Sequence, residues 1–346
     1  MRVAGPDELR RWDELVAGNP DGGQILQTRA WGEFKRAHRW APHYLLSESG
    51  PLVAVLELAH TVPGLGVLGY VPKGPGVNGI AQLPAVLDGL RATAGSAFAI
   101  KVEPEIEQSE AATSALRGMG LEKSRHDVQI SRATIIVDLR PDEDALLASF
   151  KPKCRYNLRL AQRRGVIVEP VALDGSSIDT MYSLMESTRE RAGFTLRSKE
   201  YFSGYWRLHA AAGQGQLFFA SLDGEVLAGV FATRIGSKAW YKDGGSTKEH
   251  AAVMAPHLLQ WEVMRWLKSR GVEAYDLVAV PPAGDLNPSH PLYGLYRFKS
   301  GFSERITEYV GTWDLPILRR RFSLWNAVAE RAAHQWSYRV RHDLLY

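Results

Sequence analysis

The residues with the most distinctive chemistry lie in the segment 289–302, which reads Ser-His-Pro-Leu-Tyr-Gly-Leu-Tyr-Arg-Phe-Lys-Ser-Gly-Phe. It follows a strand that is predicted to be buried, and it places Lys299 between Phe298 and Phe302. A lysine in such surroundings can be held rigidly against aromatic rings to meet an anion or a developing oxyanion. The alternative is a lysine whose stem lies on apolar surface while its ammonium group reaches solvent. The segment alone leaves both interpretations open.

A second concentration of charge lies between residues 151 and 164, which include six basic residues and no acidic one. Arg155, Arg159 and Arg163 recur at four-residue spacing, so on a helix they share one face. Like charges stacked in this way repel each other, and a bound polyanion would neutralise them. The segment therefore indicates contact with a nucleic acid or a phosphate, with a merely solvated helix face as the alternative. The basic residues are Lys151, Lys153, Arg155, Arg159, Arg163 and Arg164.

A third group lies in a predicted loop that leads into a helix capped by Ser198. Here Thr195 supplies a hydroxyl, Arg197 a forked guanidinium and Tyr201 a phenol. These groups together can bind the oxygens of a diphosphate. Helix capping combined with a surface ion pair is the alternative.

Two further residues in the first half could take part in chemistry. Lys35 lies on a predicted helix whose apolar face includes Trp31 and Phe34, where a lone lysine normally faces solvent. Glu103 ends a predicted strand, where its carboxylate could accept a proton from an amine nucleophile or form a structural ion pair. The histidines show no metal-ligand spacing, and no nucleophile elbow is present, so neither a metal nor a covalent nucleophile is expected.

Length and composition narrow the class of protein. The chain has 346 residues, a formal net charge of +4 and a single cysteine, Cys154. This length predicts two domains, and one cysteine excludes an internal disulfide and is typical of a reducing compartment. The cations around Cys154 could lower the pKa of its thiol. No run of about 18 apolar residues and no signal-peptide core are present, so we expect a cytoplasmic protein whose mild basicity permits a polyanionic partner or peripheral membrane contact.

The two halves of the chain repeat one pattern of elements. Residues 44–58 and 218–232 each read as a β-hairpin. In each half the hairpin is followed by a third strand, a helix and a further strand, the last two at 83–93 and 97–103 in the first half and at 256–270 and 274–280 in the second. We therefore expect an α/β protein with two domains of one kind, each built on a mixed sheet.

The expected domain limits follow from this repeat. The first domain should span residues 1–140 and begin with helices near Pro6–Val16 and Ala30–Ala37. The second should span 141–312 and open with a helix over Glu143–Arg164 that is interrupted near Pro152. A last helix over Pro316–Val340, within residues 313–346, should pack back on the first domain and complete it.

Six segments, taken in order along nearly the whole chain, carry a resemblance to a known family. They are Gln27–Lys35, Tyr70–Pro75, Lys151–Val166, Arg191–Phe202, Trp240–Ser246 and His290–Phe302, of which the last is the most specific. Together they resemble the FemABX family of non-ribosomal peptidyltransferases, which build peptidoglycan cross-bridges from aminoacyl-tRNA. The resemblance implies two tandem acetyltransferase (GNAT-like) domains, in agreement with the repeat.

The resemblance also implies roles for individual residues. It assigns the diphosphate of the cell-wall precursor to Lys35, Thr195, Arg197 and Tyr201. It places Tyr241 in the substrate cleft, and it places Phe298 and Lys299 where the tRNA-borne ester reacts. Its partners would be aminoacyl-tRNA and a peptidoglycan precursor, either lipid II or UDP-MurNAc-pentapeptide, with no cofactor and no DNA.

Two departures from the family pattern affect these assignments. The family usually carries Asp before the proline where this chain has Glu103, which blurs its assignment as a catalytic residue. Some members also insert a coiled-coil arm for which this chain has no room, so the basic helix becomes the alternative site for tRNA. The residues expected to bind tRNA are Lys151, Lys153, Arg155, Arg159 and Arg163.

Two other functions remain open at this stage. An acetyl-CoA-dependent N-acetyltransferase would share the fold, but it needs a phosphate-binding loop that residues 244–255 do not supply. A non-catalytic RNA-binding protein would spread aromatic and basic residues over an open platform. The transferred amino acid (Gly, Ala or Ser) and the acceptor amine also stay open.

Overall fold

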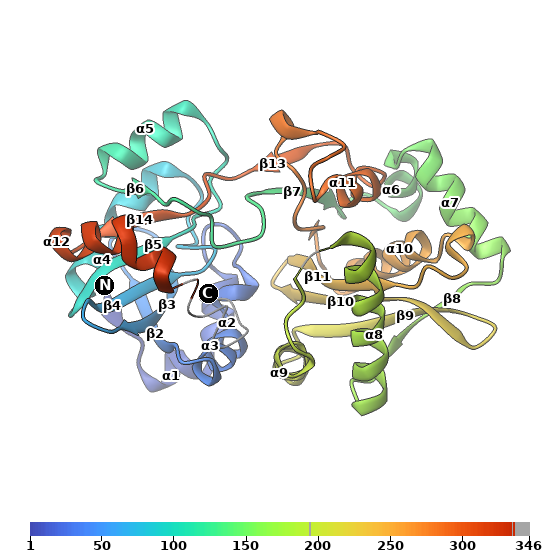
Figure 1. The fold of residues 1–346 in the computed structure, drawn as a ribbon, viewed down its shortest axis with the longest axis horizontal. Helices are drawn as coiled ribbons and strands as arrows, with labels where there is room; N and C mark the ends of the chain where they lie inside the picture. The colour runs from blue at the N-terminus through green and yellow to red at the C-terminus, as the bar shows by residue number, and fades with distance from the viewer. Residues whose placement is uncertain (194, 334, 336–346) are drawn as a thin grey trace. The chain divides into compact units, whose positions relative to one another are not determined.

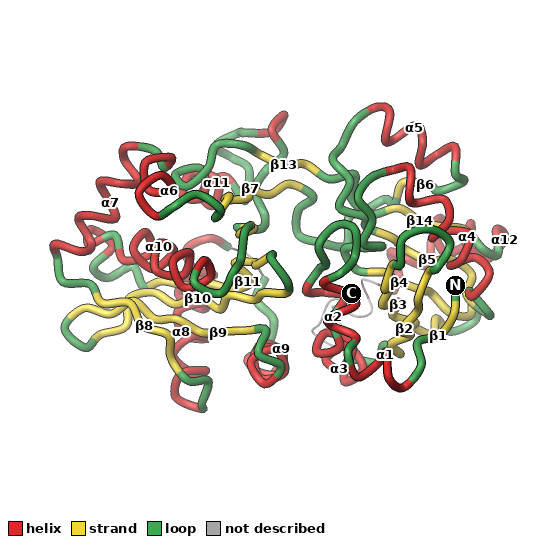
Figure 2. Tube along the Cα trace, turned by 180° about the vertical axis from the view of Figure 1, so that it is seen from behind, coloured by secondary structure: helices red, strands yellow, loops and turns green. Residues whose placement is uncertain are grey.

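The computed structural model describes every residue except 194, 334 and 336–346. The chain forms two compact units (Figure 1). The first contains Met1–Arg132 and the described residues from Tyr309 onward, and the second contains Ala133–Glu308. Each unit has one seven-stranded sheet. Within each unit, helices lie on both sides of the strands (Figure 2).

The first sheet has the strand order β1-β2-β3-β4-β5-β14-β6. Its β4–β5 pair is parallel and its other pairs are antiparallel. The strands are β1 (Arg2–Val3), β2 (Ala41–Ser47), β3 (Val53–Val62), β4 (Gly66–Val71), β5 (Ala97–Val102), β6 (Glu122–Lys123) and β14 (Trp313–Pro316). The helices are α1 (Pro6–Arg10), α2 (Trp12–Ala17), α3 (Arg29–Ala37), α4 (Leu83–Thr93), α5 (Glu110–Gly118) and α12 (Arg319–Leu324), which continues as a π-helix, η5 (Trp325–Ala329).

The second sheet has the order β13-β7-β12-β11-β10-β9-β8, in which only the β11–β12 pair is parallel among the described strands. The strands are β7 (Ala133–Asp138), β8 (Ile167–Val171), β9 (Gly215–Leu222), β10 (Glu225–Ile235), β11 (Lys238–Ser246), β12 (Ala274–Asp276) and β13 (Ile306–Glu308). The helices are α6 (Glu143–Ser149), α7 (Pro152–Arg163), α8 (Gly175–Ala192), α9 (Lys199–Ala211), α10 (Ala255–Lys268) and α11 (Tyr293–Lys299).

The predicted repeat is confirmed. Strands β2 to β5 with α4 correspond to strands β9 to β12 with α10, and in each unit the helix connects the two parallel strands. The strand predicted to reach residue 280 is shorter. It ends as β12 at Asp276, because Val278 and Ala279 have positive φ angles that leave the strand conformation.

The expected boundary after residue 140 is corrected by the pairing of β7. This strand pairs with β12 and β13 of the second sheet, so the second unit begins at Ala133. At its other end the second unit stops at Glu308 rather than at residue 312. The strand pairing decides the boundary here, because β7 has no partner in the first sheet among the described strands.

The C-terminal segment returns to the first unit, as predicted, but it does so first as a strand. β14 lies between β5 and β6, and α12 then begins at Arg319 rather than at Pro316. A buried ion pair fixes this return, because Lys101 Nζ lies 2.9 Å from carboxylate oxygens of both Asp314 and Glu330. Burial alone would lower the pKa of Lys101, but the two carboxylates raise it. The predicted helix end at Val340 lies outside the described residues.

The two faces of the second sheet carry different helices. On β10, Val230 and Ala232 belong to the core beneath α7 and α10, whereas Gly229 and Phe231 face α8 and α9. A Cβ atom at Gly229 would lie 2.7 Å from Met181 Sδ, so glycine is needed for the close approach of α8. The alternation along one strand thus separates a large apolar core from the face that carries α8 and α9.

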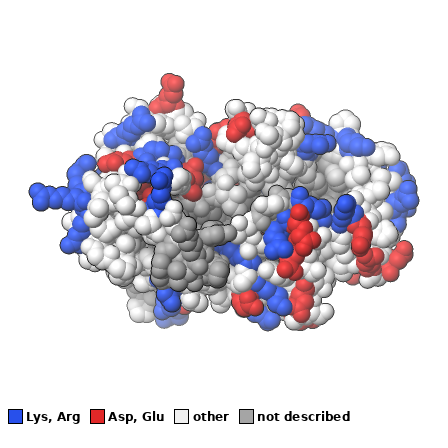
Figure 3. Space-filling view, viewed as in Figure 1, with Lys and Arg blue, Asp and Glu red and all other residues white. Residues whose placement is uncertain are grey.

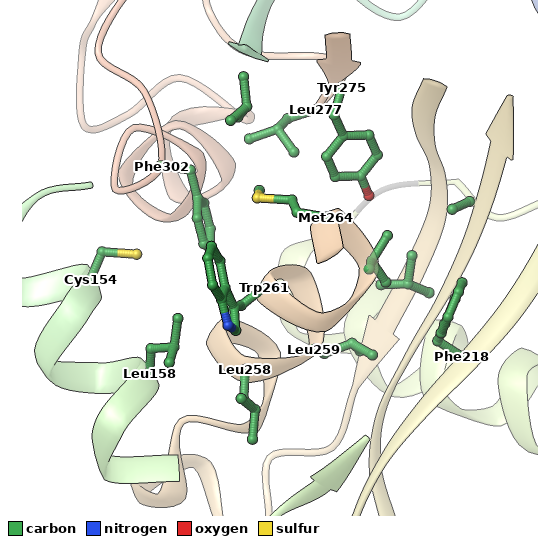
Figure 4. Packing of buried hydrophobic residues seen from close by; sticks show 14 of the residues in the cluster. Cys154, Leu158, Phe218, Leu258, Leu259, Trp261, Met264, Tyr275, Leu277 and Phe302 are labelled. Carbon is green, nitrogen blue, oxygen red and sulfur yellow. The ribbon is translucent and has the colours of Figure 1, made fainter. Parts of the chain in front are cut away.

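The core between α7 and α10 also settles the state of the cysteine. Cys154 lies beside Leu158, and Trp261 and Phe302 form part of the same core (Figure 4). Burial raises the pKa of the Cys154 thiol to about 12 and outweighs the lowering effect of the Arg155 charge, so the net decrease suggested by the sequence does not occur. The thiol is a core group.

Within the described residues, no helix combines the length and apolar character that crossing a bilayer requires.

Candidate functional site

Lys299 is the last residue of α11 and is almost fully buried, at 4% exposure. Its ammonium group donates hydrogen bonds to the backbone carbonyls of Val278 and Ala279, with N–O distances of 2.7 and 3.1 Å. The same group lies 5.6 Å from the centre of the Tyr241 ring, within the range of a cation–π contact. Of the two interpretations left open by the sequence, these contacts favour an ammonium group held beside an aromatic ring, at the end of a helix, over one that reaches solvent.

The two carbonyls are presented by a strained turn that follows β12. Val278 and Ala279 have φ angles of 57° and 29°, and the first is unusual for a β-branched residue. The Asp276 carboxylate holds the turn, because its Oδ1 accepts a hydrogen bond from the Val278 amide at 2.6 Å. The same oxygen accepts a hydrogen bond from the Thr134 hydroxyl of β7. Asp276 thus positions the acceptors of Lys299.

Burial changes the protonation of this group of residues. It lowers the pKa of Lys299 to about 7, against the opposing charge of Asp276, which raises it. Burial raises the pKa of Tyr241 to about 12, to which the Asp243 charge contributes, so the phenol keeps its proton. A neighbouring hydrogen bond joins α10 to β12: Gln260 Oε1 accepts a hydrogen bond from the Tyr275 hydroxyl at 3.0 Å. At neutral pH, Lys299 can therefore exchange its proton while Tyr241 remains a neutral ring.

Phe298 does not provide the ring beside Lys299. Its ring lies 5.1 Å from that of His257 and 5.4 Å from that of Phe302, both in edge-to-face geometry. Burial lowers the pKa of His257 to about 4, so this contact is with a neutral imidazole. The position of Lys299 beside Phe298 in the sequence suggested that this ring holds the ammonium group, but the ring 5.6 Å from it is that of Tyr241.

The structure brings Arg197 and Tyr201 together at the start of α9. The Arg197 guanidinium lies 4.2 Å from the centre of the Tyr201 ring. Ser198 caps the helix, as predicted, because its hydroxyl oxygen accepts a hydrogen bond from the Tyr201 amide. Thr195 is exposed, two residues before Arg197. The Tyr182 hydroxyl donates to the Arg197 carbonyl at 3.1 Å, which anchors the loop to α8.

α9 is tied to the strand that carries Tyr241. Trp206 Nε1 donates a hydrogen bond to Asp243 Oδ2 at 2.8 Å, and both side chains are buried. The pairing of β10 with β11 shifts register here, so that Lys242 is an extra residue between Tyr241 and Asp243. This bulge bends β11 at the point where it meets both α9 and the lysine site.

In the first unit, Lys35 is buried, at 2% exposure, and does not face solvent as a lone lysine on a helix normally would. Its ammonium group lies 5.4 Å from the centre of the Trp31 ring and 5.7 Å from that of Trp40. Thr28 begins the helix, because its hydroxyl oxygen accepts a hydrogen bond from the Trp31 amide. Lys35 is therefore a second buried cation with aromatic neighbours.

Glu103 is buried among hydrogen-bond donors of its own unit. Tyr70 donates a hydrogen bond to its Oε2 at 2.6 Å, and Thr312 donates one to its Oε1 at 2.6 Å. The Lys73 amide adds a longer contact of 3.4 Å to Oε2. These donors occupy both carboxylate oxygens, an arrangement typical of a structural carboxylate rather than a free base. These contacts favour a structural role for Glu103, through hydroxyl donors rather than through the ion pair expected from the sequence.

The basic residues of α7 differ in their contacts and in their exposure. Arg155 donates hydrogen bonds of 2.7 Å to the carbonyls of Ala148 and Phe150, so it caps the end of α6. Arg159 and Arg163 are exposed. Basic side chains gather over this part of the second unit (Figure 3). Fewer of the three arginines at four-residue spacing are therefore exposed than the sequence indicated.

The two lysines of the basic segment 151–164 each have a close neighbour. Lys151 Nζ lies 2.7 Å from Glu304 Oε1, and Lys153 Nζ lies 4.7 Å from the centre of the Tyr156 ring. Both side chains are accessible, so these contacts are of the weak surface kind.

Sequence reasoning missed the turn at residues 278–279 and the hydrogen bond of Gln260 with Tyr275. The strand predicted to continue through residue 280 concealed the turn, because its apolar residues fit a buried strand equally well. The two prolines that follow it, Pro281 and Pro282, were the available signal of a break.

Comparisons with known proteins agree with this arrangement. Residues 148–300 match the family model of an acetyltransferase (GNAT) domain. The lipid II:glycine glycyltransferase of Staphylococcus aureus strain MRSA252 is 25% identical over 400 aligned residues, covering 92% of this chain and 94% of that protein. The crystal structure of FemX superposes with a TM-score of 0.82 at 23% identity, covering 94% of this chain and 98% of that one. The C-terminal domain of a putative lysylphosphatidylglycerol synthetase from Agrobacterium fabrum has a TM-score of 0.52 at 16% identity, covering 93% and 96%.

The duplicated sheets and the GNAT match define a protein with two tandem GNAT-like domains. Within that class, the similarity to the glycyltransferase extends over nearly the full length of both chains. This full-length similarity supports the resemblance to the FemABX family that the motifs of the chain indicated.

Proposed function

We propose that this protein transfers an amino acid from aminoacyl-tRNA to the side-chain amine of the stem peptide in a peptidoglycan precursor, either lipid II or UDP-MurNAc-pentapeptide. The observation that carries the proposal is the buried Lys299, held by two carbonyls against Tyr241, in a chain that matches a lipid II:glycine glycyltransferase along its length. The enzyme is accordingly an aminoacyltransferase of cell-wall synthesis.

The reaction is an aminolysis of an ester. The stem-peptide amine attacks the aminoacyl carbonyl, a C–N bond forms, and the C–O bond to the tRNA ribose breaks. The proton lost by the amine passes to the departing ribose oxygen. Negative charge develops on the carbonyl oxygen in between, and we assign its stabilisation to the Lys299 ammonium group, worth about 3–4 kcal/mol if it matches other oxyanion donors. Alignment of the two substrates lowers the activation barrier further, by about several kcal/mol.

The precursor diphosphate is assigned to the cationic residues outside the lysine site. Arg197 stacks on Tyr201 and offers a planar fork of donors, and the exposed Thr195 hydroxyl lies two residues away. For Lys35, the same role rests on the family resemblance. Its aromatic neighbours restrict its side chain, which reduces the entropy lost when an anion binds.

The donor tRNA is assigned to the exposed part of α7. Arg159 and Arg163 lie one helical turn apart and are exposed, whereas Arg155 is occupied by backbone carbonyls. An exposed row of arginines is suited to a phosphate backbone, which it would contact without reading sequence.

The GNAT match favours acetyl-CoA as a second candidate donor, and one experiment separates it from aminoacyl-tRNA. The protein is incubated with lipid II or UDP-MurNAc-pentapeptide and with glycyl-, alanyl- or seryl-tRNA, or acetyl-CoA. Mass spectrometry of the precursor should show the gain of one aminoacyl residue from a charged tRNA. A mass gain of one acetyl group with acetyl-CoA alone would contradict the proposal. Binding of tRNA without any mass gain would favour the non-catalytic alternative.

A further inference from the structure

An apolar groove of about 380 Å³ lies on the first unit, at a distance in sequence from every residue assigned to the reaction. One wall is the turn between β3 and β4, residues 62–65, and the other is the helical segment that follows β14. Leu324 and Val328 line this second wall and are 55% and 63% exposed. Leu318, at the start of the same segment, is 40% exposed. Leu324 and Val328, one helical turn apart, thus expose two large apolar side chains on one surface.

Exposed arginines lie on the segment that forms the second wall of the groove. Arg319, Arg320 and Arg331 are exposed on the same segment, and Arg125 donates a hydrogen bond of 3.5 Å to the Ala327 carbonyl beside it. In the described stretch 317–333, the one acidic residue is Glu330, which is buried against Lys101. Figure 3 shows basic side chains around the region where Figure 1 places α12. The exposed charge carried by this segment is therefore positive, with Glu122 of β6 lying 3.7 Å from the Arg319 guanidinium.

We propose that this surface, defined by Leu324, Val328 and the exposed arginines Arg319, Arg320 and Arg331 of the same segment, is a docking face for an anionic lipid bilayer. Exposed apolar side chains flanked by arginines are the composition of segments that lie in the bilayer interface, where the apolar groups enter the acyl boundary and the cations contact anionic headgroups. The two requirements are met here by one segment of one unit.

A nucleic acid fits this surface less well. A phosphate backbone would satisfy the arginines but would leave Leu324 and Val328 in contact with water or charge. Single-stranded nucleic acid stacks its bases on exposed aromatic rings. The aromatic residues of the described segment, Phe322 and Trp325, are instead buried against Phe98 and its neighbours.

This inference does not depend on the transfer reaction, although the two are compatible. Docking on the bilayer would bring the protein to the surface at which a lipid-linked acceptor resides. A soluble precursor would not need the docking face, so the face favours lipid II as the acceptor if the proposed function holds.

The test measures binding of the full-length protein to vesicles by co-sedimentation. Vesicles of phosphatidylcholine alone are compared with vesicles that also contain phosphatidylglycerol. The wild-type protein should bind the anionic vesicles, and binding should weaken as salt is added. The double variant Leu324→Ser with Val328→Ser should reduce the affinity about tenfold or more. The double variant Arg319→Gln with Arg320→Gln should reduce it about fivefold for each arginine.

Matched controls carry the same chemical changes elsewhere. Ile130 and Ile167 are 83% and 60% exposed, and Arg11 and Arg117 are exposed arginines outside this surface. Ile130→Ser with Ile167→Ser and Arg11→Gln with Arg117→Gln should leave vesicle binding within about twofold of wild type. Since all the substituted side chains are exposed, circular dichroism melting curves should coincide.

The outcomes distinguish the docking face from the reaction. Failure of the wild-type protein to bind anionic vesicles, or equal losses in the control variants, would overturn the docking face. So would a loss of tRNA binding in the arginine variant without any loss in the Leu324 and Val328 variant, which would identify a nucleic-acid surface. Transfer to soluble UDP-MurNAc-pentapeptide should be unchanged in the docking-face variants. Vesicle binding without any transfer activity would leave the face intact and refute only the proposed function.

Discussion

Lys299 combines two properties that are rarely found together in a lysine. It is nearly inaccessible, and its hydrogen bonds go to two uncharged carbonyls, so burial lowers its pKa to about 7. A cation in these surroundings is well placed to gain from an approaching negative charge. The site thus holds a charge whose energy improves when an oxyanion forms.

This protonation behaviour predicts a pH-dependent effect on stability. Between about pH 7 and pH 10 the unfolded chain keeps the proton on Lys299 while the folded chain releases it, so unfolding takes up a proton. The free energy of unfolding of the wild-type protein should therefore rise with pH across this window, relative to that of Lys299→Met. Urea unfolding of both proteins at a series of pH values measures the difference. A difference that stays constant from about pH 6 to about pH 10 would show that Lys299 is not desolvated.

Sequence could identify Lys299 and the pair Arg197 and Tyr201, because their spacing and neighbours are local. It could not identify Tyr241 as the ring beside Lys299, because that contact joins residues far apart in the chain. The nearby Phe298 was the natural choice from spacing, and helix geometry turns its side chain toward His257 instead. For Glu103, the sequence could not show that Thr312 would return to occupy its carboxylate.

At the scale of the element, the turn after β12 determines where Lys299 points. Its two carbonyls face the same ammonium group because Val278 and Ala279 adopt positive φ angles, at a cost of about 1–3 kcal/mol for such residues. The Asp276 carboxylate offsets this cost by accepting the Val278 amide hydrogen. The strained turn therefore directs two successive carbonyls to one ammonium group, which a regular strand would not do.

Substitutions at Asp276 should separate hydrogen bonding from charge. Asp276→Ala removes the acceptor of the Val278 amide and should lower the free energy of unfolding by about 1–3 kcal/mol, with a fall in transfer rate. Asp276→Asn keeps an acceptor oxygen and should retain most of the stability. Because the Asp276 charge raises the pKa of Lys299, the Asn variant should shift the pH dependence of transfer to lower pH. Unchanged stability and transfer rate in Asp276→Ala would exclude the positioning role, and an unaltered pH profile in Asp276→Asn would exclude the charge effect.

The basic helix α7 yields a second prediction at this scale. Arg159→Glu with Arg163→Glu should raise the KM for aminoacyl-tRNA and lower the slope of log affinity against log salt by about 0.7–0.9 for each phosphate that the variant no longer neutralises. The exposed pair Arg11→Glu with Arg117→Glu is the control for net charge. Filter binding of tRNA at several salt concentrations provides the measurement. Equal effects of both pairs would mean that α7 is a solvated face.

Arg155 is left out of that test for a structural reason. Its guanidinium bonds the carbonyls at the end of α6, so its replacement would disturb helix packing as well as charge. The four-residue spacing predicted one face for the three arginines, and the break before Pro152 turned one of them toward the preceding helix.

At the scale of the whole molecule, the chain is two copies of one architecture, and that much was readable from the sequence. Hairpins, helices and crossovers are encoded by local periodicity, so the repeat and the α/β class could be predicted. The positions of β7 and β14 in the sheets could not be predicted, because each pairs with a strand that is far away in the sequence. β14 is short and follows the second unit directly, so it resembles a linker in sequence.

The return of β14 makes the first unit dependent on the C-terminal segment. Without it, Lys101 would lose both carboxylates, and losing partners of a buried charge costs about 3–5 kcal/mol. The edges of β5 and β6 would also lose their shared neighbour. A fragment of residues 133–308 should therefore unfold cooperatively, whereas a fragment of residues 1–132 should not fold unless the segment from residue 309 is supplied. Cooperative thermal unfolding of residues 1–132 alone would contradict this dependence.

The most direct test of the account is the single-turnover rate of aminoacyl transfer from charged tRNA to the peptidoglycan precursor. The rate of the wild-type protein is compared with that of Lys299→Met and of Arg297→Met, which removes an exposed cation two residues away. The account predicts that Lys299→Met lowers the rate about 10²–10³-fold without loss of thermal stability, and that Arg297→Met transfers at nearly the wild-type rate. Full transfer by Lys299→Met, or an equal loss in both variants, would contradict it.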